Sequence, residues 1–216
     1  MREHEIEPVP GLPEKLPEGE GILWQGSPRW WSLTTRALHL RGLAIYFALM
    51  VAWSVASAAT SGGTFGEAAL ASATSLGLAV LCLGVLVAIG RALSHAALYT
   101  ITNRRIVLRV GVALPMTINI PFSAIESAAV KQHADGTEDI VLTLSPDHKV
   151  AWLALWPHAR PWRVGRAEPM LRAVPVTSGA AQALARALAA SASVAVAPRP
   201  EGIVAERPRM RGAVAV

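Results

Sequence analysis

The hydrophobic pattern of the chain is dominated by two long stretches without charged side chains. Residues 42–66 form one uncharged run and residues 68–90 form another, and Glu67 is the charged residue that separates them. A helix needs about 20 apolar residues to cross the hydrocarbon core of a bilayer, so each run is long enough. Because only helices satisfy their own backbone hydrogen bonds there, the pattern predicts a transmembrane hairpin with helices near residues 43–59 and 69–90.

Two alternatives to a membrane hairpin are less compatible with this pattern. A hairpin buried inside a soluble protein normally carries charged residues on one helix face, and these runs carry none. A signal peptide is not expected, because the first run begins at residue 42, behind an acidic segment. Arginines flank the base of the hairpin, whereas the connecting residues 60–64 include no Lys or Arg, so the positive-inside rule predicts a multi-pass protein with both termini in the cytoplasm.

Small residues recur at four-residue spacing on both predicted helices. Such faces allow close approach between helices in lipid. We expect part of this surface to join the two helices and the rest to meet a second copy or a foreign transmembrane helix. The helix-packing candidates are Ala48, Ala52 and Ala56 on the first helix and Gly77, Gly84 and Ala88 on the second.

The charges outside the hairpin are divided unevenly. Residues 1–20 carry −4, residues 21–41 carry +3 and residues 91–216 carry +7, which with the hairpin's −1 gives the formal net charge of +5. A basic domain beside an anionic leaflet is attracted to it, so membrane lipid is an expected partner. The sequence shows no helix-turn-helix, zinc-finger or RNP pattern, and nucleic-acid binding is not expected.

Short runs of β-strand composition follow the hairpin and predict a small β-sandwich or barrel. These runs are residues 98–102, 105–112, 116–120, 128–132, 140–145, 150–155 and 172–177. A final helix is expected over residues 178–193 with Ser178 as its N-cap. A third membrane helix over residues 180–197 is the alternative for that segment, although Arg186 at its centre would be costly in lipid.

No set of residues in the sequence points to catalysis, and an enzyme is not expected. The motifs for an acyl-transfer nucleophile, a phosphate-binding loop, a dinucleotide site and a zinc protease are absent. Cys82 is the single cysteine, which excludes a disulfide framework and a thiolate zinc site. No metal is expected at the acidic cluster around Gly136, which is predicted to be a solvated hairpin tip; its members are His133, Asp135, Glu138 and Asp139.

Two histidines lie just outside the membrane runs on the predicted cytoplasmic side. His39 and His95 occupy similar settings, after Ala-Leu and after Leu-Ser. Because neutral imidazole is a common metal ligand, they are candidate ligands for a tetrapyrrole such as bacteriochlorophyll. The alternative is a pair of interfacial histidines that touch lipid headgroups or the soluble domain, so no cofactor is expected on present grounds.

Two patches after the hairpin carry a resemblance to a known family. Tyr99-Thr100-Ile101-Thr102-Asn103-Arg104-Arg105-Ile106-Val107 and Ile120-Pro121-Phe122-Ser123-Ala124-Ile125 resemble the membrane-anchored bacterial PH-like domains of the YdbS type. This resemblance implies an α+β membrane protein in which the hairpin is followed by a seven-stranded PH-like sandwich closed by a C-terminal helix. The predicted parts are a proline-rich arm and interfacial segment (1–41), the hairpin (42–93), a cytoplasmic PH-like domain (94–194) and a flexible tail (195–216).

The amino-terminal run carries a second, more specific resemblance. Glu7-Pro8-Val9-Pro10-Gly11-Leu12-Pro13-Glu14-Lys15-Leu16-Pro17-Glu18-Gly19-Glu20, followed by Leu23-Trp24-Gln25-Gly26 and Pro28, is similar to the PuhB family of photosynthetic complex assembly proteins of purple phototrophic bacteria. The resemblance implies a non-enzymatic assembly factor in the inner or intracytoplasmic membrane. Its implied partners are subunits of the reaction centre and the core light-harvesting antenna. Such proteins are sometimes drawn with three spans, whereas the charge pattern here predicts two.

Contacts with client subunits are expected from the arm and from tryptophans near the hairpin. Extended arms bind grooves or sheet edges at little ordering cost, and tryptophan is enriched at binding hot spots. The candidate partner-binding residues are Pro8, Pro10, Leu12, Pro13, Trp24, Trp30 and Trp31. For these tryptophans the alternatives are packing on the protein's own domain or, for Trp30 and Trp31, anchoring at the membrane interface. Two other functions stay open, namely a PH-like sensor of lipid or envelope state and a bacteriochlorophyll delivery factor, and a homodimer is compatible with each.

Overall fold

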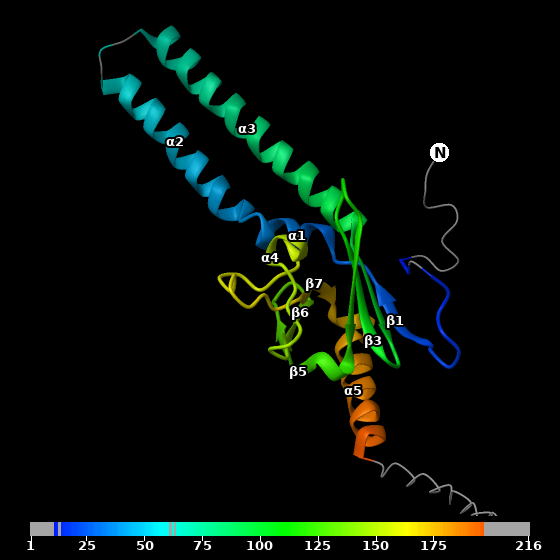
Figure 1. Cartoon of the computed structure of the whole chain (residues 1–216). Helices are drawn as coiled ribbons and strands as arrows, with labels where there is room; N and C mark the ends of the chain where they lie inside the picture. The colour runs from blue at the N-terminus through cyan, green and yellow to red at the C-terminus, as the bar shows by residue number, and fades with distance from the viewer. Residues whose placement is uncertain (1–10, 13, 61, 63, 197–216) are drawn as a thin grey trace, which may run out of the picture.

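The computed structural model describes residues 11–12, 14–60, 62 and 64–196. A long helical hairpin stands on a β-rich domain, and a final helix leaves that domain at the end opposite the hairpin (Figure 1). Several predictions lie outside the described residues, namely those on Pro8, Pro10, Pro13 and the tail beyond Val196.

Helices α2 (Leu40–Thr60) and α3 (Phe65–Ala96) form the predicted hairpin. At about 1.5 Å per residue, α2 is about 31 Å long and α3 about 48 Å, against a hydrocarbon core of about 30 Å. Both helices are long and apolar enough to cross a membrane, and only 6% and 11% of their most apolar windows are buried. The alternative of a hairpin buried in a soluble protein therefore does not describe this structure.

Glu67 belongs to a capping box at the start of α3. Thr64 Oγ1 accepts a hydrogen bond from the backbone N–H of Glu67 at 3.4 Å, and Glu67 Oε2 accepts one from the backbone N–H of Thr64 at 2.9 Å. This reciprocal pair satisfies two backbone donors at the helix start. The charge that separates the two apolar runs thus lies at the distal end of the hairpin, in the first turn of α3, and interrupts neither helix.

A short helix, α1 (Trp30–Ala37), lies across the base of the hairpin (Figure 1). The sequence predicted an interfacial segment over these residues and did not predict a separate helix. α1 packs very closely on α3, because a Cβ added to Gly90 would lie 2.2 Å from Thr34 Oγ1. Four residues further along α3, Ser94 Oγ donates a hydrogen bond to the carbonyl oxygen of Pro28 at 2.7 Å. The last two turns of α3 are therefore joined to α1, and its free part is close to the predicted 69–90.

The described residues form seven strands in two antiparallel sheets. The first sheet has the order β1 (Ile22–Gly26), β2 (Leu98–Thr102), β3 (Arg105–Val110) and β4 (Met116–Pro121). The second has the order β5 (Ile125–Gln132), β6 (Thr137–Leu144) and β7 (Met170–Pro175). A 3-10 turn, η2 (Phe122–Ala124), connects the two sheets. No strand pairing joins the sheets within the described residues, so the domain is an open sandwich and not a closed barrel.

One predicted strand of the sandwich is wrong, and one strand of the sandwich was not predicted. Residues 150–155 contain the short helix α4 (Trp152–Leu155) and not a strand. The seventh strand is β1, from the segment assigned to the arm, where Trp24 pairs with Ile101 of β2. β1 was missed because it is short and half-exposed, and because its pairing partner lies beyond the whole hairpin.

The C-terminal helix α5 (Ala180–Val196) packs into the domain core. Ser178 is not its N-cap, because Ser178 lies in a 3-10 turn and Gly179, with a φ of 71°, comes directly before the helix. Leu184 is buried together with Tyr99, Ile140 and Leu171 of the two sheets. α5 is not among the two helices that qualify as membrane spans in the described part of the chain. The structure therefore favours the closing helix over a third membrane helix.

Candidate functional site

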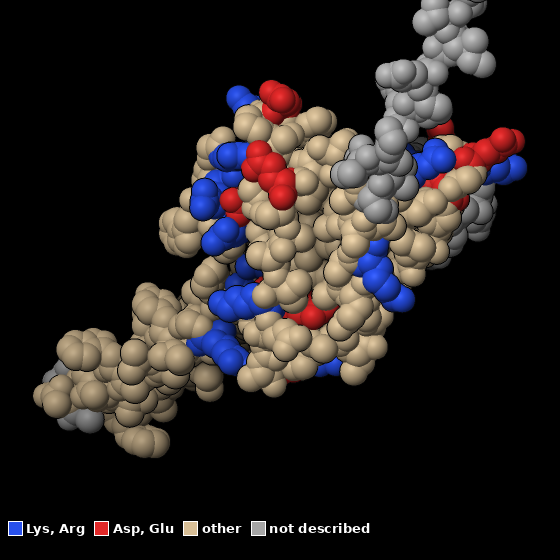
Figure 2. Space-filling view, turned by 90° about the horizontal axis from the view of Figure 1, so that it is seen from below, with Lys and Arg blue, Asp and Glu red and all other residues tan. Residues whose placement is uncertain are grey.

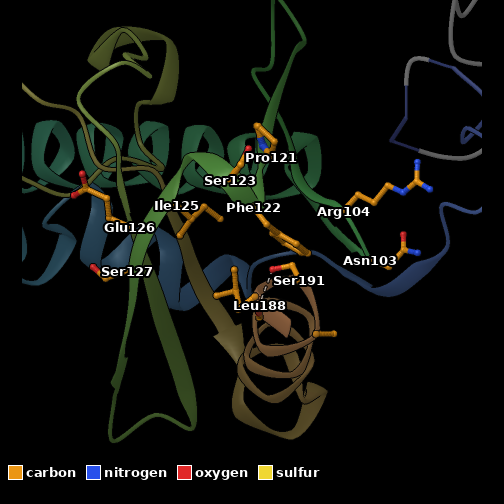
Figure 3. Close-up of a pocket in the computed structure, with 12 residues that line it drawn as sticks. Asn103, Arg104, Pro121, Phe122, Ser123, Ile125, Glu126, Ser127, Leu188 and Ser191 are labelled. Atoms are coloured by element: carbon orange, nitrogen blue, oxygen red, sulfur yellow. Dashed lines mark hydrogen bonds between the residues drawn. The ribbon is translucent and has the colours of Figure 1, made fainter. Parts of the chain in front are cut away.

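An open groove of about 870 Å³ lies between η2, β5 and α5 (Figure 3). Figure 1 places these elements at the end of the sandwich away from the hairpin. Four segments line the groove: the β2–β3 turn, η2, the start of β5 and the last turns of α5. The lining residues are Asn103, Arg104, Pro121, Phe122, Ser123, Ile125, Glu126, Ser127, Leu188, Ala190, Ser191 and Ala192.

The groove has an apolar floor and a polar rim. Phe122, Ile125 and Leu188 point toward one another, while Arg104 and Glu126 lie at opposite ends (Figure 3). Among the described strands, β5 pairs with β6 alone, and its residues beyond Ile125 are exposed. The outer backbone edge of β5 is therefore open beside the apolar floor. An open strand edge next to a hydrophobic groove suits an extended peptide that adds as a further strand.

Of the predicted partner-binding residues that the structure describes, none lines this groove; these are Leu12, Trp24, Trp30 and Trp31. The sequence pattern over residues 120–125, which carries part of the family resemblance, includes Phe122 and Ile125 of the groove, but it did not indicate a binding site. The groove brings Asn103 next to Ser191. Periodicity in a single sequence cannot show which distant segments meet, so the groove emerged only from the structure.

A second feature, the junction cluster, joins α1 to the tip of the β5–β6 hairpin. Arg36 Nη2 donates to Thr137 Oγ1 at 2.7 Å, and the Arg36 guanidinium lies 3.6 Å from Asp135 and 3.8 Å from Asp139. His133 Nε2 lies 2.9 Å from Asp139 Oδ2. The prediction of a solvated acidic tip is wrong, since Asp139 is buried. The sequence hid this arrangement because Arg36 comes from a segment on the other side of the hairpin.

The junction cluster keeps Asp135 ionised. Burial alone would raise the pKa of Asp135, but hydrogen bonds from Thr137 and Ser32 and the charge of Arg36 hold it well below its usual range. The described residues contain no group of three His, Cys, Asp or Glu side chains placed to hold a metal ion. The cluster therefore supplies ion pairs that fix α1 on the domain.

A buried Tyr–His pair ties the loop after α4 to the end of α3. The Tyr99 hydroxyl, three residues beyond α3, is hydrogen-bonded to His158 Nδ1 at 2.6 Å and accepts a hydrogen bond from the backbone N–H of Arg172 at 3.3 Å. Burial, with a smaller contribution from the charge of Arg172, lowers the pKa of His158 to about 3. The imidazole is therefore neutral at physiological pH, which leaves Nδ1 free to accept. Both side chains are buried, so the pair holds the fold together.

The described part of the amino-terminal arm is bound to its own domain. Leu12, a predicted partner contact, is buried, and a Cβ added to Gly11 would lie 2.3 Å from Leu98 Cδ2. Arg105 Nε donates to Glu20 Oε1 at 2.8 Å. Leu12 therefore packs on the protein itself, and partner binding by Leu12 stays a prediction.

The three predicted tryptophans behave differently from one another. Trp24 packs against the domain core, which was the alternative stated for it. Trp30 and Trp31 are 36% and 48% exposed and meet edge to face, with ring centroids 5.4 Å apart. The guanidinium of Arg91 lies 5.4 Å from the Trp30 ring centre. Partner binding by Trp30 and Trp31 stays a prediction, and their position at the hairpin base is compatible with it.

The small-residue faces do not join α2 to α3. All six residues are exposed, namely Ala48, Ala52, Ala56, Gly77, Gly84 and Ala88. A Cβ added to Gly77 or Gly84 would meet nothing within 4 Å. The less exposed helix positions are instead Phe47 and Val51 of α2 and Ala79 of α3. Contact of the small-residue faces with another helix stays a prediction.

The two candidate pigment ligands lie at the base of the hairpin. His39, with a φ of 53°, is the turn residue between α1 and α2, and His95 belongs to the last turn of α3. Both side chains are exposed. Pigment binding by either histidine stays a prediction.

Comparison with known families matches residues 36–190 to the family described as Bacterial PH domain. The matched region begins in α1 and ends in α5, so it includes the hairpin as well as six of the seven strands. This chain belongs to the bacterial PH domain family. An "uncharacterized 23.7 kDa protein in puhA 5'region" of Rhodobacter capsulatus is 36% identical over 190 residues, which is 87% of this chain and 89% of that protein. No solved structure matches this member of the family.

Proposed function

We propose that this PH-domain protein is a membrane-anchored, non-enzymatic assembly factor of the PuhB type. It holds subunits of the photosynthetic reaction centre and core antenna while they assemble. The observation that carries the proposal is the relative in the puhA 5′ region, because a protein 36% identical over most of both chains is encoded beside a photosynthetic gene. The amino-terminal resemblance to PuhB proteins supports the same function.

Anchorage in the inner or intracytoplasmic membrane is supported by the surface of the hairpin. Large apolar side chains cover its outside, among them Trp53 and Leu70. Figure 2 shows this surface without blue or red side chains, whereas Lys and Arg gather on the domain next to it. Exposed apolar surface costs about 25 cal/mol per Å² in water, so a bilayer is the favourable surrounding. By the positive-inside rule, the arginines at the base of the hairpin support an orientation with both termini in the cytoplasm.

Each surface of the molecule has a distinct part in holding a client. The groove beside β5 receives an extended segment of a client subunit through backbone pairing and the apolar floor. The exposed small-residue face of α3 receives a client transmembrane helix by close backbone packing. Trp30 and Trp31 contact the same client where its helix leaves the membrane.

Co-purification from a phototrophic host tests the proposal. Tagged wild-type protein should recover reaction-centre or core-antenna polypeptides. Ala190→Glu places a charge in the groove and should lower this recovery at least tenfold, while Ala189→Glu, on the same helix but outside the groove lining, should not. Full recovery with Ala190→Glu would contradict the role of the groove. An eluate with lipid or bacteriochlorophyll and no such polypeptide would contradict the assembly function and favour a lipid sensor or a pigment carrier.

A further inference from the structure

Exposed apolar side chains lie at the tips of three segments of the PH-like domain, namely the β3–β4 turn, the short helix α4 and the loop after it. Val112 and Leu114 lie in the β3–β4 turn and are 53% and 79% exposed. Leu153 of α4 is 80% exposed. Trp162 and Val164, in the loop between α4 and β7, are 94% and 67% exposed. Together these three tips form what we call the apolar rim. Burial in the domain core explains none of them.

The apolar rim lies at the end of the domain from which the hairpin departs. Figure 1 shows the β3–β4 turn rising to the end of α3, and α4 with its following loop level with α1. Contacts between β3 and α3 support the first placement. The hydrogen bond between Tyr99 and His158 supports the second, since it joins the α4 loop to the residue three places beyond α3.

The loops that carry the rim are held in defined conformations by contacts at their bases. Gly111 has a φ of 104°, and a Cβ added to it would lie 2.2 Å from the carbonyl oxygen of Leu114, so the β3–β4 turn is tight. The base of the third loop is closed by a bridge between Ala159 and Pro169 and by the ion pair of Arg160 with Glu168 at 2.8 Å. Fixed loop bases present the apolar tips in one direction at no further ordering cost.

Cationic side chains accompany the rim. Arg160 precedes the third tip and Arg163 lies between Trp162 and Val164, and their side chains are 49% and 54% exposed. Arg41 and Arg91 are exposed where the helices leave the domain. Apolar tips among cations match the interface of an anionic bilayer, where apolar groups enter the headgroup region and cations meet lipid phosphates. β3, which leads into the first tip, also contacts α3, one of the two candidate membrane-spanning helices, so this tip lies next to the proposed membrane anchor.

We infer that the PH-like domain lies against the bilayer that holds its own hairpin and inserts the apolar rim among the lipid headgroups. The inference rests on the proposed membrane anchorage. It fixes the orientation of the molecule, because the groove beside β5 then faces the cytoplasm.

Depth-dependent fluorescence quenching tests the inference on the full chain in vesicles that contain anionic phospholipid. An environment-sensitive fluorophore is attached to single cysteines introduced in a Cys82→Ala background, as Leu114→Cys, Leu153→Cys and Val164→Cys. Ala192→Cys, exposed on α5 away from the hairpin, is the matched control. Lipids with a nitroxide near the headgroup should quench the three rim probes at least threefold more than the Ala192→Cys probe.

The native Cys82 separates failure of the inference from failure of the anchorage. A fluorophore on Cys82, midway along α3, should be quenched best by nitroxides deep in the acyl chains. Deep quenching at Cys82 with rim probes as unquenched as Ala192→Cys would overturn the inference and leave the anchorage intact. Absence of quenching at Cys82 would overturn both. Rim probes shielded equally in dilute detergent and in vesicles would overturn the inference in favour of a protein contact.

Discussion

At the scale of single residues, the junction between hairpin and domain depends on contacts that leave no spare space. The side chain of Thr34 fills the space where a side chain at position 90 would lie, and Thr34 is fully buried between α1 and α3. Gly77 and Gly84, on the same helix, face open space. A larger side chain therefore fits at Gly77 and Gly84 but not at Gly90, although all three lie on the same helix.

Gly90→Val should destabilise the protein by about 1–3 kcal/mol, because the added atoms overlap Thr34 and force α1 away from α3. Thermal unfolding in detergent measures the effect. Gly77→Val is the matched control and should change stability by less than about 1 kcal/mol. Equal losses for the two variants would show that the close approach at Gly90 does not hold α1 in place.

His158 gives the stability of the protein a pH dependence with a defined sign. Its pKa in the folded protein is about 3, below its ordinary value of 6.5, so the unfolded chain binds the proton more readily. The stability contributed by neutral His158 is complete above pH 6.5 and falls as the pH drops toward 3, by about 1.4 kcal/mol per unit at most. Denaturant unfolding at pH 7.5 and pH 5 should differ accordingly.

His158→Gln is the control for this pH dependence. Its amide oxygen can still accept from Tyr99 but does not titrate. The variant should lose most of the slope between pH 6.5 and pH 4.5, a window that lies above the range in which Asp135 takes up a proton. An unchanged slope in His158→Gln would assign the acid sensitivity to another group.

At the scale of secondary structure elements, α1 acts as the connection between the hairpin and the sandwich. It contacts α3 through Thr34 and the second sheet through Arg36, whose charges and hydrogen bonds reach the tip of the β5–β6 hairpin. The backbone N–H of Arg29, just before α1, also donates to the carbonyl oxygen of Ala173 in β7 at 2.8 Å. One short helix thus binds three elements that are distant in the sequence.

Arg36→Met should destabilise the PH-like domain by about 1–3 kcal/mol. The substitution leaves Asp135 and Asp139 without their cation, and the partial exposure of Arg36 keeps the loss below that of a fully buried pair. Limited proteolysis should cut between α1 and α2 faster than in the wild type, and denaturant unfolding gives the free energy. Arg41→Met, at an exposed position, is the control and should behave as the wild type does.

The sequence predicted elements well where local pattern decides them. The hairpin, the strands β2 to β7 and the closing helix follow from apolar runs and turn residues such as Asn103 and Gly136. α4 was predicted as a strand, because a helix of four residues is too short to show a helical period. β1 was not predicted, because Trp24 pairs with Ile101, which lies beyond the hairpin in the sequence. The groove and the junction cluster were missed for the same reason: Leu188 meets Phe122, and Arg36 meets Asp139, only after the chain has folded.

At the scale of the whole molecule, the hairpin separates two surfaces with different surroundings. The distal loop carries the capping box of Thr64 and Glu67, and the opposite end carries the groove beside β5. Under the proposed anchorage these ends lie on opposite sides of the membrane. Anchorage and orientation are therefore testable with one set of single-cysteine variants.

Thiol labelling in a Cys82→Ala background should place the two ends on opposite sides. Thr60→Cys, at the end of α2, should react with a membrane-impermeant maleimide in intact spheroplasts, because the distal loop faces the periplasm. Asp147→Cys, in the exposed loop after β6, should react only after the cells are broken. Labelling of Asp147→Cys in intact spheroplasts would contradict the cytoplasmic orientation of the domain.

The double attachment of α1 has a mechanical consequence. α1 packs tightly against α3 on one side and forms ion pairs with the second sheet on the other. A change in the tilt of the hairpin therefore moves the sandwich as well. Under the proposed function, a client transmembrane helix that displaces the hairpin would therefore also reorient the groove beside β5, on the cytoplasmic side.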